Sequence, residues 1–353
     1  MTTIAFASCM YSRVHFADRT QPVWTHVSAH KPDWLFLCGD NIYMDYFGSL
    51  YEPKNWSAAK FASEMQVRYS AQFAVKSFRS LLASIPQGQV LGVWDDHDFA
   101  WNNCWGTETT FGMPLKKKIA TAFFHHYFAT LNLRPLPATL PQLDLTDLAN
   151  LPRSNDPTYQ AQRVGPFRAL FCDVRSYRED NTSGTTTSSL LGAEQEKWLL
   201  DNLASDNGPF LIVSGSTMTK GDDQSWDAFK DFYHNRFLPS VRDKTVLFIG
   251  GDVHENRLPP QQDDEPIELV SSAAVLDPPF DKKNFGLIQV TATGTNMFLY
   301  KHNKVQYTGR VNFKSGAFKT NMYARNRVAS PKATVKRASA QRKSALRQLS
   351  ATR

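Results

Sequence analysis

Five short apolar runs, each followed by a polar residue, constrain the fold of this chain more than any other feature. Their length and their content of β-branched and aromatic residues are typical of buried strands. Longer segments with apolar residues at helical spacing lie between them. Strands that alternate with helices predict a layered α/β fold. The runs cover residues 4–8, 34–38, 90–94, 210–213 and 246–249.

The residues that follow these runs are of the kinds that bind ligands. In open α/β sheets, binding sites form at the carboxyl ends of the strands, and we therefore expect the five run ends to face one cleft. Gly39, Gly250 and Gly251 let the chain turn sharply there. The run ends are Cys9 and residues 39–41, 95–97, 214–216 and 250–254.

The stretch 89–103 carries the densest set of candidate ligands. Its apolar run is followed by Asp95, Asp96, His97 and Asp98. Carboxylates crowded in this way repel one another, hold protons or bind a cation. Hard cations take several carboxylate oxygens, and imidazole suits zinc, iron or manganese. An acidic surface turn is the alternative, but such a turn needs neither a leading buried strand nor a histidine among its acids.

From the remaining segments we expect a mixed sheet, arranged as two packed sheets with helices on the outside. Ser57 can cap a long helix that ends near Pro86. Further helices are expected from Pro114, after Gly192 and over about Trp226–Leu238. Four later runs have the spacing of an antiparallel meander, and two segments read as irregular. The meander runs are 268–270, 287–291, 297–300 and 305–307, and the irregular segments are a surface excursion at 135–166 and a loop at 181–189.

The cysteines and the N-terminal residues favour a cytoplasmic protein. The four cysteines, at positions 9, 38, 104 and 172, form no C-x-x-C pair. This spacing argues against a disulfide framework or a zinc knuckle. No apolar run reaches the roughly 18 residues of a membrane span. The opening MTTIAFASC shows neither the basic region nor the cleavage site of a signal peptide.

Charge is divided between an acidic body and a basic end. The net charge is +7, yet residues 282–353 hold 16 of the 40 lysines and arginines and no acid. The other 24 stand against 33 acids in residues 1–281, a net charge of −9. We expect a folded domain at 1–313 and a flexible basic tail at 314–353. The tail is either a solvated segment or a contact for a polyanion: nucleic acid, polyphosphate or anionic lipid.

Six motifs occur in the order seen in one known family. They are FASC (6–9), GDNIYMD (39–45), VWDDHDFAWNN (93–103), FCDVRSYRED (171–180), LGAEQEKWL (191–199) and VLFIGGDVHENR (246–257). In these motifs the chain resembles the alkaline phosphatase D (PhoD-like) metallophosphatases, a family of calcineurin-like metallophosphoesterases. The resemblance covers roughly residues 4–313. It implies a four-layer α-β-β-α sandwich of two mixed sheets that hydrolyses phosphate monoesters or diesters with a metal-activated water.

The resemblance also implies roles for the site residues. Asp40 would bridge two metal ions, and His97, with Asp96, would be catalytic by protonating the leaving oxygen or stabilising charge in the transition state. A thiolate and a phenolate would suit Fe³⁺, with Ca²⁺ beside it and Mn²⁺ or Zn²⁺ as alternatives. The other ligands would be Cys9, Tyr43 and Asp252 or His254 at one ion, and Asp95 or Asp96 with His254 at the other.

Amide and guanidinium groups are the predicted contacts of a small phosphate-ester substrate. Arginine suits bidentate recognition of phosphate. Each of these residues also has a structural alternative: an amide that orients Asp40, a simple turn, or a salt bridge to Asp173 or Glu179. The predicted substrate-binding residues are Asn41, Asn103, Arg175 and Arg178.

Several other residues have structural interpretations. Cys9 could be a small buried residue and Tyr43 a core aromatic with a satisfied hydroxyl. Residues 116–118 are predicted to be a solvated helix start. His125 and His126 are predicted to be packing and surface residues.

Two functions remain open at this point. One is the metal-dependent phosphoric ester hydrolase. The other is a non-catalytic protein that keeps the fold and binds polyanions or membranes through its basic tail. The intact set of acids favours the enzyme, because unpaired buried acids are costly to retain.

Overall fold

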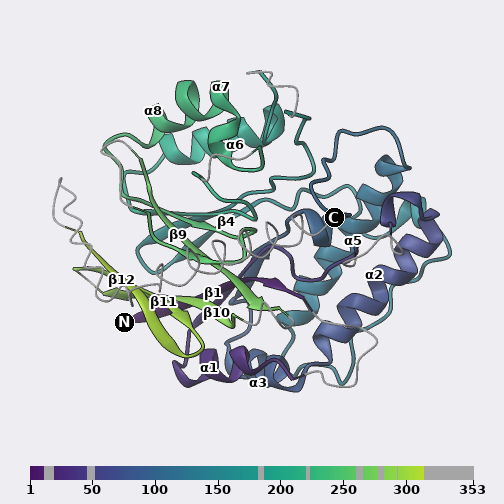
Figure 1. Cartoon of the computed structure of the whole chain (residues 1–353), viewed down its shortest axis with the longest axis horizontal. Coiled ribbons are helices and arrows are strands. Elements are labelled where there is room, and N and C mark those ends of the chain that lie inside the picture. Colours follow the sequence, from purple (N-terminus) through teal and green to yellow (C-terminus); the bar gives the residue numbers. More distant parts are fainter. Residues whose placement is uncertain are drawn as a thin grey trace, which may run out of the picture.

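Strand β1 (Thr2–Met10) organises the fold because it pairs with three other strands. The computed structural model describes residues 1–11, 20–45, 52–181, 187–219, 223–259, 265–276, 282–291 and 293–313. Strand β1 runs parallel to β2 (Trp34–Cys38) and antiparallel to β10 (Asn284–Thr291), and its last residues pair in parallel with β9 (Ile267–Val275). The result is a large mixed sheet, which confirms the mixed α/β prediction (Figure 1).

Two sets of strands meet at the pair β1 and β9. Strands β1, β2, β3, β5, β6, β7 and β9 run in one direction, so their carboxyl ends lie at one edge, where sites form. The first set follows the order β3 (Val90–Val93), β2, β1, β10, β11 (Gly294–Lys301) and β12 (Lys304–Asn312). The second follows β4 (Gln160–Val164), β5 (Phe167–Phe171), β6 (Phe210–Val213), β7 (Val246–Gly250) and β9, which also pairs with β8 (Asn256–Arg257).

The predicted antiparallel meander is confirmed for β10, β11 and β12. The segment 268–270 was wrongly included in it. These residues belong to β9, which runs parallel to both β7 and β1. Residues 251–266 connect β7 to β9, and a connection of this length can return the chain to the start of the sheet, as parallel pairing requires.

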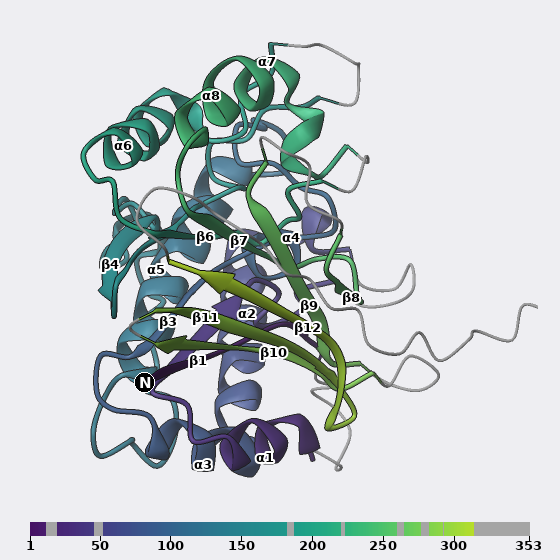
Figure 2. The ribbon, with the colours of Figure 1, turned by 90° about the vertical axis from the view of Figure 1, so that its left-hand side faces the viewer.

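The two faces of the strands enter different cores. Ile4 and Phe6 belong to a core between the two sets of strands, whereas Ala5 and Ala7 pack toward helices, because successive strand residues point to opposite faces. Figure 2 shows helices on both sides of the strands. The first set packs on α1 (Pro22–Ala29), α2 (Ala58–Phe73), α3 (Lys76–Ser84) and α5 (Met113–Leu131), and the second on α6 (Gly192–Ala204), α7 (Lys230–Phe232) and α8 (Leu238–Val241).

The helix predicted from Ser57 to Pro86 is two helices. Ser57 does cap α2, since its Oγ accepts the N–H of Lys60 at 3.2 Å. The chain then leaves the helical conformation at Val75 (φ −63°, ψ 116°), between α2 and α3. This break turns α3 so that its apolar residues, including Phe78, pack against α1.

The helix predicted over 226–238 is also interrupted. It consists of a 3₁₀ turn, the short α7, a π turn at Tyr233–Phe237 and the start of α8. The rings of Phe232 and Phe237 lie 5.6 and 5.1 Å from that of Trp226. The π turn thus lies within this aromatic cluster.

Residues 116–118 are not simply a solvated helix start, because Lys116 is buried. Its Nζ donates hydrogen bonds to the carbonyl oxygens of Pro53, Lys54 and Phe111 at 3.0, 2.8 and 2.7 Å. These bonds satisfy a buried ammonium and tie the start of α5 to two neighbouring segments.

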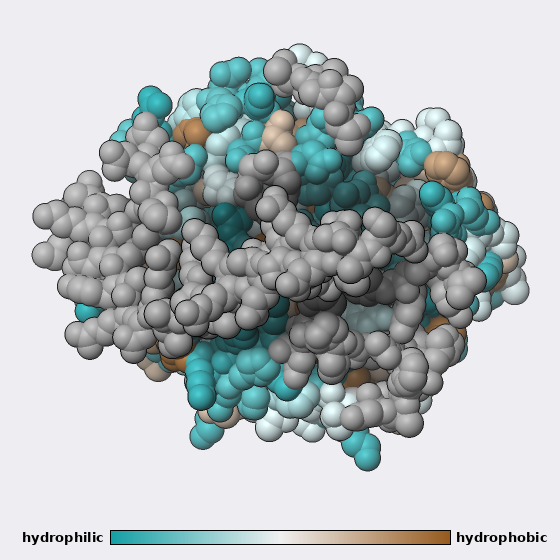
Figure 3. Space-filling view, viewed as in Figure 1, coloured by the Kyte–Doolittle hydropathy of each residue, from teal (hydrophilic) through white to brown (hydrophobic). Residues whose placement is uncertain are grey.

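The excursion at 135–166 is irregular as predicted, apart from a 3₁₀ turn η2 (Leu148–Asn150) and the edge strand β4. The predicted basic tail (314–353) and residues 182–186 of the predicted loop lie outside the described residues. Within the described ranges, every helix is too short or too polar to span a membrane. On the face in Figure 3 the described surface is mainly hydrophilic, with scattered hydrophobic residues.

Candidate metal centre

Glycines bring the strand ends of both sets close together. Gly39 follows β2 with φ +88°, and a Cβ here would lie 2.8 Å from the Cβ of Asp95 and 3.1 Å from the Cα of Gly215. A Cβ on Gly251 would press on the carbonyl oxygens of Cys38 and Gly215. Backbones that approach so closely leave room only for glycine. The ends of β2, β3, β6 and β7 therefore meet at one place, as the sequence predicts.

A thiol, a carboxylate, a phenol and an imidazole converge beside the end of β1. Sγ of Cys9 lies 3.2 Å from Oδ2 of Asp40. The hydroxyl of Tyr43 lies 3.1 Å from the same oxygen and 3.0 Å from Nε2 of His254. The ligand atoms of Cys9, Asp40 and His254 all lie within 4.8 Å of one another. This group is compact enough to hold a cation.

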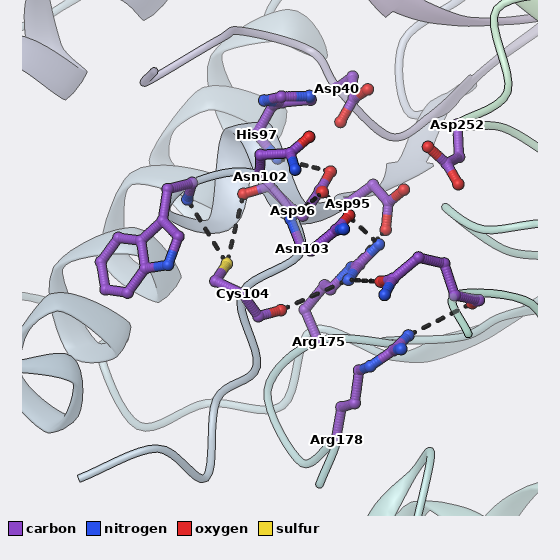
Figure 4. A network of polar contacts seen from close by, with 12 residues as sticks. Asp40, Asp95, Asp96, His97, Asn102, Asn103, Cys104, Arg175, Arg178 and Asp252 are labelled. Carbon is purple, nitrogen blue, oxygen red and sulfur yellow. Dashed lines mark hydrogen bonds and ion pairs between the residues drawn. The ribbon is translucent and has the colours of Figure 1, made fainter. Parts of the chain in front are cut away.

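A second group shares Asp40 with the first. Ligand atoms of Asp40, Asp96 and His97 also lie within 4.8 Å of one another. Asp96 is fixed by the N–H of His97, which donates to Oδ1 at 2.9 Å, and by the N–H of Asn103, which donates to Oδ2 at 2.5 Å. Figure 4 shows the carboxylates of the site gathered around one space, which Asp252 also borders. Asp40 is thus the point where the two groups meet.

Four of these residues have left-handed backbone conformations. The angle φ is 60° at Cys9, 52° at Asp40, 71° at Asp252 and 53° at His254. Such conformations cost an L-residue roughly 1–2 kcal/mol, and they cluster at functional sites. The prediction that Asp252 and His254 alternate along a strand end is wrong, because β7 ends before them. A turn directs them instead, and the N–H of His254 donates to Oγ of Ser272 at 2.9 Å.

Burial raises the pKa of three groups in the first set: the Asp40 carboxyl, the Cys9 thiol and the Tyr43 phenol. Cys9 raises the pKa of Asp40 further, and Asp40 raises that of Tyr43. Oδ1 of Asp40 is buried and has no hydrogen-bond partner among the described residues. A cation beside this oxygen would supply the missing partner and favour the ionised forms of all three groups.

At His97 and Asp96, neighbouring groups outweigh the effect of burial on the pKa. Burial lowers the pKa of His97, but Asp96, Asp40 and Asp45 together raise it well above its usual value. Burial raises the pKa of Asp96, but His97, Arg175 and two N–H donors bring it down to about 2. The ring of His97 also stacks on that of Tyr43, with centroids 4.2 Å apart. An imidazolium beside the ionised Asp96 is therefore favoured here.

Asp45 also belongs to the site, although its sequence pattern predicted no role for it. Its Oδ1 lies 2.5 Å from Nδ1 of His97. The only signal for it was its place at the end of the GDNIYMD motif, 52 residues before His97.

Asn41 forms hydrogen bonds with the end of β3 and the segment that follows it. Its N–H donates to Oδ2 of Asp98 at 3.0 Å, and its Nδ2 donates to the carbonyl oxygen of Val93 at 3.0 Å. Oδ1 of Asp98 in turn accepts the N–H of Asp95 at 2.6 Å. Asn41 and Asp98 thus link the segment after β2 to the one after β3. Asn103, in contrast, is exposed at the rim of the site.

The two arginines are buried. Arg175 forms an ion pair with Asp95, Nε to Oδ1, at 2.5 Å, and not with Asp173 or Glu179 as the structural alternative suggested. Arg178 donates to the carbonyl oxygens of residues 223 and 224. Neither guanidinium has the exposed surface that the predicted contact with a substrate phosphate requires.

Fold and site together define a class: an α/β protein with a candidate metal centre where the carboxyl ends of its parallel strands meet. The model of the PhoD-like phosphatase family matches residues 4–326, and the chain belongs to this family.

Alkaline phosphatase D from Bacillus subtilis (strain 168) is 25% identical over 292 residues, which cover 71% of this chain and 46% of that protein. The chain therefore spans about half the length of this relative. Among solved structures, a dimetal phosphatase from Danio rerio matches with a TM-score of 0.53 at 11% identity, over 91% of this chain and 99% of that one. The structural likeness supports the fold.

Proposed function

We propose that this chain is a metal-dependent hydrolase of phosphate esters, acting as a phosphomonoesterase, a phosphodiesterase or both. The observation that carries the proposal is that Asp40 lies close to Cys9 and His254 on one side and to Asp96 on the other, with His97 beside Asp96. A carboxylate shared in this way can join two cations, an arrangement that suits in-line displacement at phosphorus. Membership of the PhoD-like phosphatases supports the same class of reaction.

The donor atoms support iron together with a second cation that takes mainly oxygen ligands. Thiolate and phenolate ligands suit Fe³⁺, which we assign to the group of Cys9, Tyr43 and Asp40. Carboxylates suit Ca²⁺, with Mn²⁺ or Zn²⁺ as alternatives, beside Asp96. Asp95 and Asp252, at the border of both groups, are the further proposed ligands. Bound cations would neutralise phosphate charge and acidify a water molecule, so that hydroxide is available near neutral pH.

The protein's own part in the reaction is centred on His97. Asp45 holds Nδ1 of the ring, which leaves Nε2 to serve the site. Asp96 and Asp45 raise the pKa of His97 and so favour a proton on the imidazole, and we assign this proton to the leaving oxygen of the ester. Ionised Asp96 stabilises the imidazolium before that transfer. We assign Asn103, which is exposed at the rim of the site, to contact with the substrate phosphate.

The finer architecture belongs to the same proposal. Three apolar cores, one between the two sets of strands and one under each group of helices, support four layers in the order α-β-β-α. A site at the strand ends of two facing sheets would draw ligands from both.

Removal and return of metal tests the function. The full chain is treated with a chelator, and hydrolysis of an aryl phosphate monoester and an aryl diester is measured before and after adding Fe³⁺, Ca²⁺, Mn²⁺ or Zn²⁺. We expect turnover to be lost with the metal and to return with it. Bound cations without turnover of either ester would favour the non-catalytic binding protein.

A further inference from the structure

Arg175 lies under the candidate metal centre and is fixed on three sides. Its Nε donates to Oδ1 of Asp95 at 2.5 Å, and its Nη1 donates to Oε1 of Gln224 at 2.9 Å and to the carbonyl oxygen of Cys104 at 3.4 Å. Its Nη2 lies 4.0 Å from Oδ2 of Asp96. With 0% of its surface exposed, the side chain cannot move without repacking its surroundings.

The carboxylate of Asp95 is held at one oxygen only. Oδ2 is buried and lacks a hydrogen-bond partner within the described part of the chain. Figure 4 shows Asp95 between Arg175 on one side and the space bordered by Asp40 and Asp252 on the other. A guanidinium that is itself held in place and binds one carboxylate oxygen restricts the rotation of the carboxylate, and with it the direction of the other oxygen. Burying an oxygen without a partner is costly, and a cation in that space would provide one.

We propose that Arg175 is a positioning residue, which aims Oδ2 of Asp95 at the cation site and does not contact the substrate. This inference rests on the proposed function, because it requires a bound cation. It differs from the role that the sequence predicts for Arg175, in which the guanidinium binds the substrate phosphate. The two roles lead to different losses when the guanidinium is removed: metal affinity in the first case, substrate affinity in the second.

Arg178 provides a matched control. It is equally buried and lies on the same segment, but its Nη1 and Nη2 donate to the carbonyl oxygens of Gln224 and Asp223 at 3.3 and 2.6 Å. Its guanidinium also lies 4.8 Å from the centre of the Phe229 ring. Replacing Arg178 therefore removes a buried arginine without releasing Asp95.

The experiment measures Mn²⁺ affinity of the full chain by competition with a chelator, alongside KM for an aryl phosphate and Ki for inorganic phosphate. Arg175→Gln should weaken Mn²⁺ binding by about 10- to 100-fold, the range typical of residues that orient a metal ligand, with KM and Ki at saturating metal unchanged. Arg178→Gln should change Mn²⁺ affinity far less. Adding Asp95→Asn to Arg175→Gln should cost less than the two separate losses combined, because both act through one carboxylate.

Two results would overturn the inference. Equal losses of Mn²⁺ affinity in the Arg175 and Arg178 variants would assign the effect to packing. Unchanged Mn²⁺ affinity with raised KM and Ki would assign Arg175 to the substrate.

If Arg175→Gln does not fold, Arg175→Ala with added guanidinium replaces it: recovery of Mn²⁺ affinity supports positioning, and folded protein without recovery contradicts it. A wild-type chain that binds Mn²⁺ but hydrolyses no ester would overturn the proposed function alone, since the comparison of affinities would still decide the role of Arg175.

Discussion

Nδ1 of His97 lies 2.5 Å from Oδ1 of Asp45, although 52 residues separate the two in the chain. Oδ2 of Asp45 accepts the N–H of Asn102 at 2.8 Å, so the carboxylate is anchored to the backbone just beyond His97. A carboxylate bound to one imidazole nitrogen sets the tautomer and the orientation of the ring. His97 therefore serves the site through its other nitrogen.

Substitution of His97 should separate proton transfer from metal binding. His97→Ala should lower kcat by roughly 10²–10⁴, the usual contribution of a general acid, and leave metal content unchanged. Asp45→Asn should cause a smaller loss, about 10- to 100-fold, because it weakens the hold on the ring and removes one of the charges that raise the His97 pKa. Steady-state kinetics with metal analysis of the same samples provides the check, and full turnover in His97→Ala would rule out its assigned role.

Asp40 should be needed for both cation groups. Asp40→Asn is expected to remove bound metal and activity together, because one oxygen pair serves both groups of ligands. Asp252→Asn should have the same effect. Asp201→Asn, on the exposed face of α6, is the control and should keep its metal. Elemental analysis after gel filtration measures the outcome, and a fully loaded Asp40→Asn protein would contradict the shared role.

Tyr43 should give an iron-loaded protein a visible colour. Coordination of the phenolate by Fe³⁺ would produce a charge-transfer band that Tyr43→Phe abolishes. Tyr11→Phe is the matched control, because its ring lies edge-on to Tyr43 with centroids 5.2 Å apart. An absorption spectrum unchanged by Tyr43→Phe would exclude the phenolate as a ligand.

Because the strand ends approach closely, replacing Gly39 by alanine should lower the free energy of unfolding more than the same substitution at a glycine with similar backbone geometry. Gly39 and Gly88 have φ of +88° and +80°, but a Cβ on Gly88 would meet no atom of the described residues within 4 Å. Gly88→Ala should cost roughly 1–2 kcal/mol from its left-handed conformation. Gly39→Ala should cost about 1–3 kcal/mol more, because its Cβ overpacks against Asp95. Urea denaturation compares the two, and equal costs would argue against the tight junction.

Acid should destabilise the fold in part through His125. This side chain is buried on α5, and burial lowers its pKa below the usual value. The unfolded chain then binds a proton at higher pH than the folded chain, so the free energy of unfolding falls as the pH drops below about 6.5. His125→Gln should flatten this part of the profile relative to the unsubstituted chain. Denaturation at pH 5 and 7.5 measures the difference, and parallel profiles for the two proteins would contradict it.

Local patterns in the sequence determined most of the strands, their order along the chain and the kinds of side chain that follow them, but not β4 or β8. The run 90–94, followed by Asp95, Asp96 and His97, predicted a buried strand with a site at its end. Such a prediction is possible because strand propensity and turn formation depend mainly on neighbouring residues. The motifs added the family, and with it Cys9 and Tyr43, which composition alone would have left in the core.

Tertiary structure alone decided how those pieces are used. Segment 268–270 lies in the parallel strand β9, where the two sets of strands meet. The buried Arg175 binds Asp95, and Asp45 binds His97. Each of these outcomes depends on which distant segments come into contact and on which groups lose water there. Such contacts involve residues tens of positions apart, and their interaction energies exist only once the chain is folded.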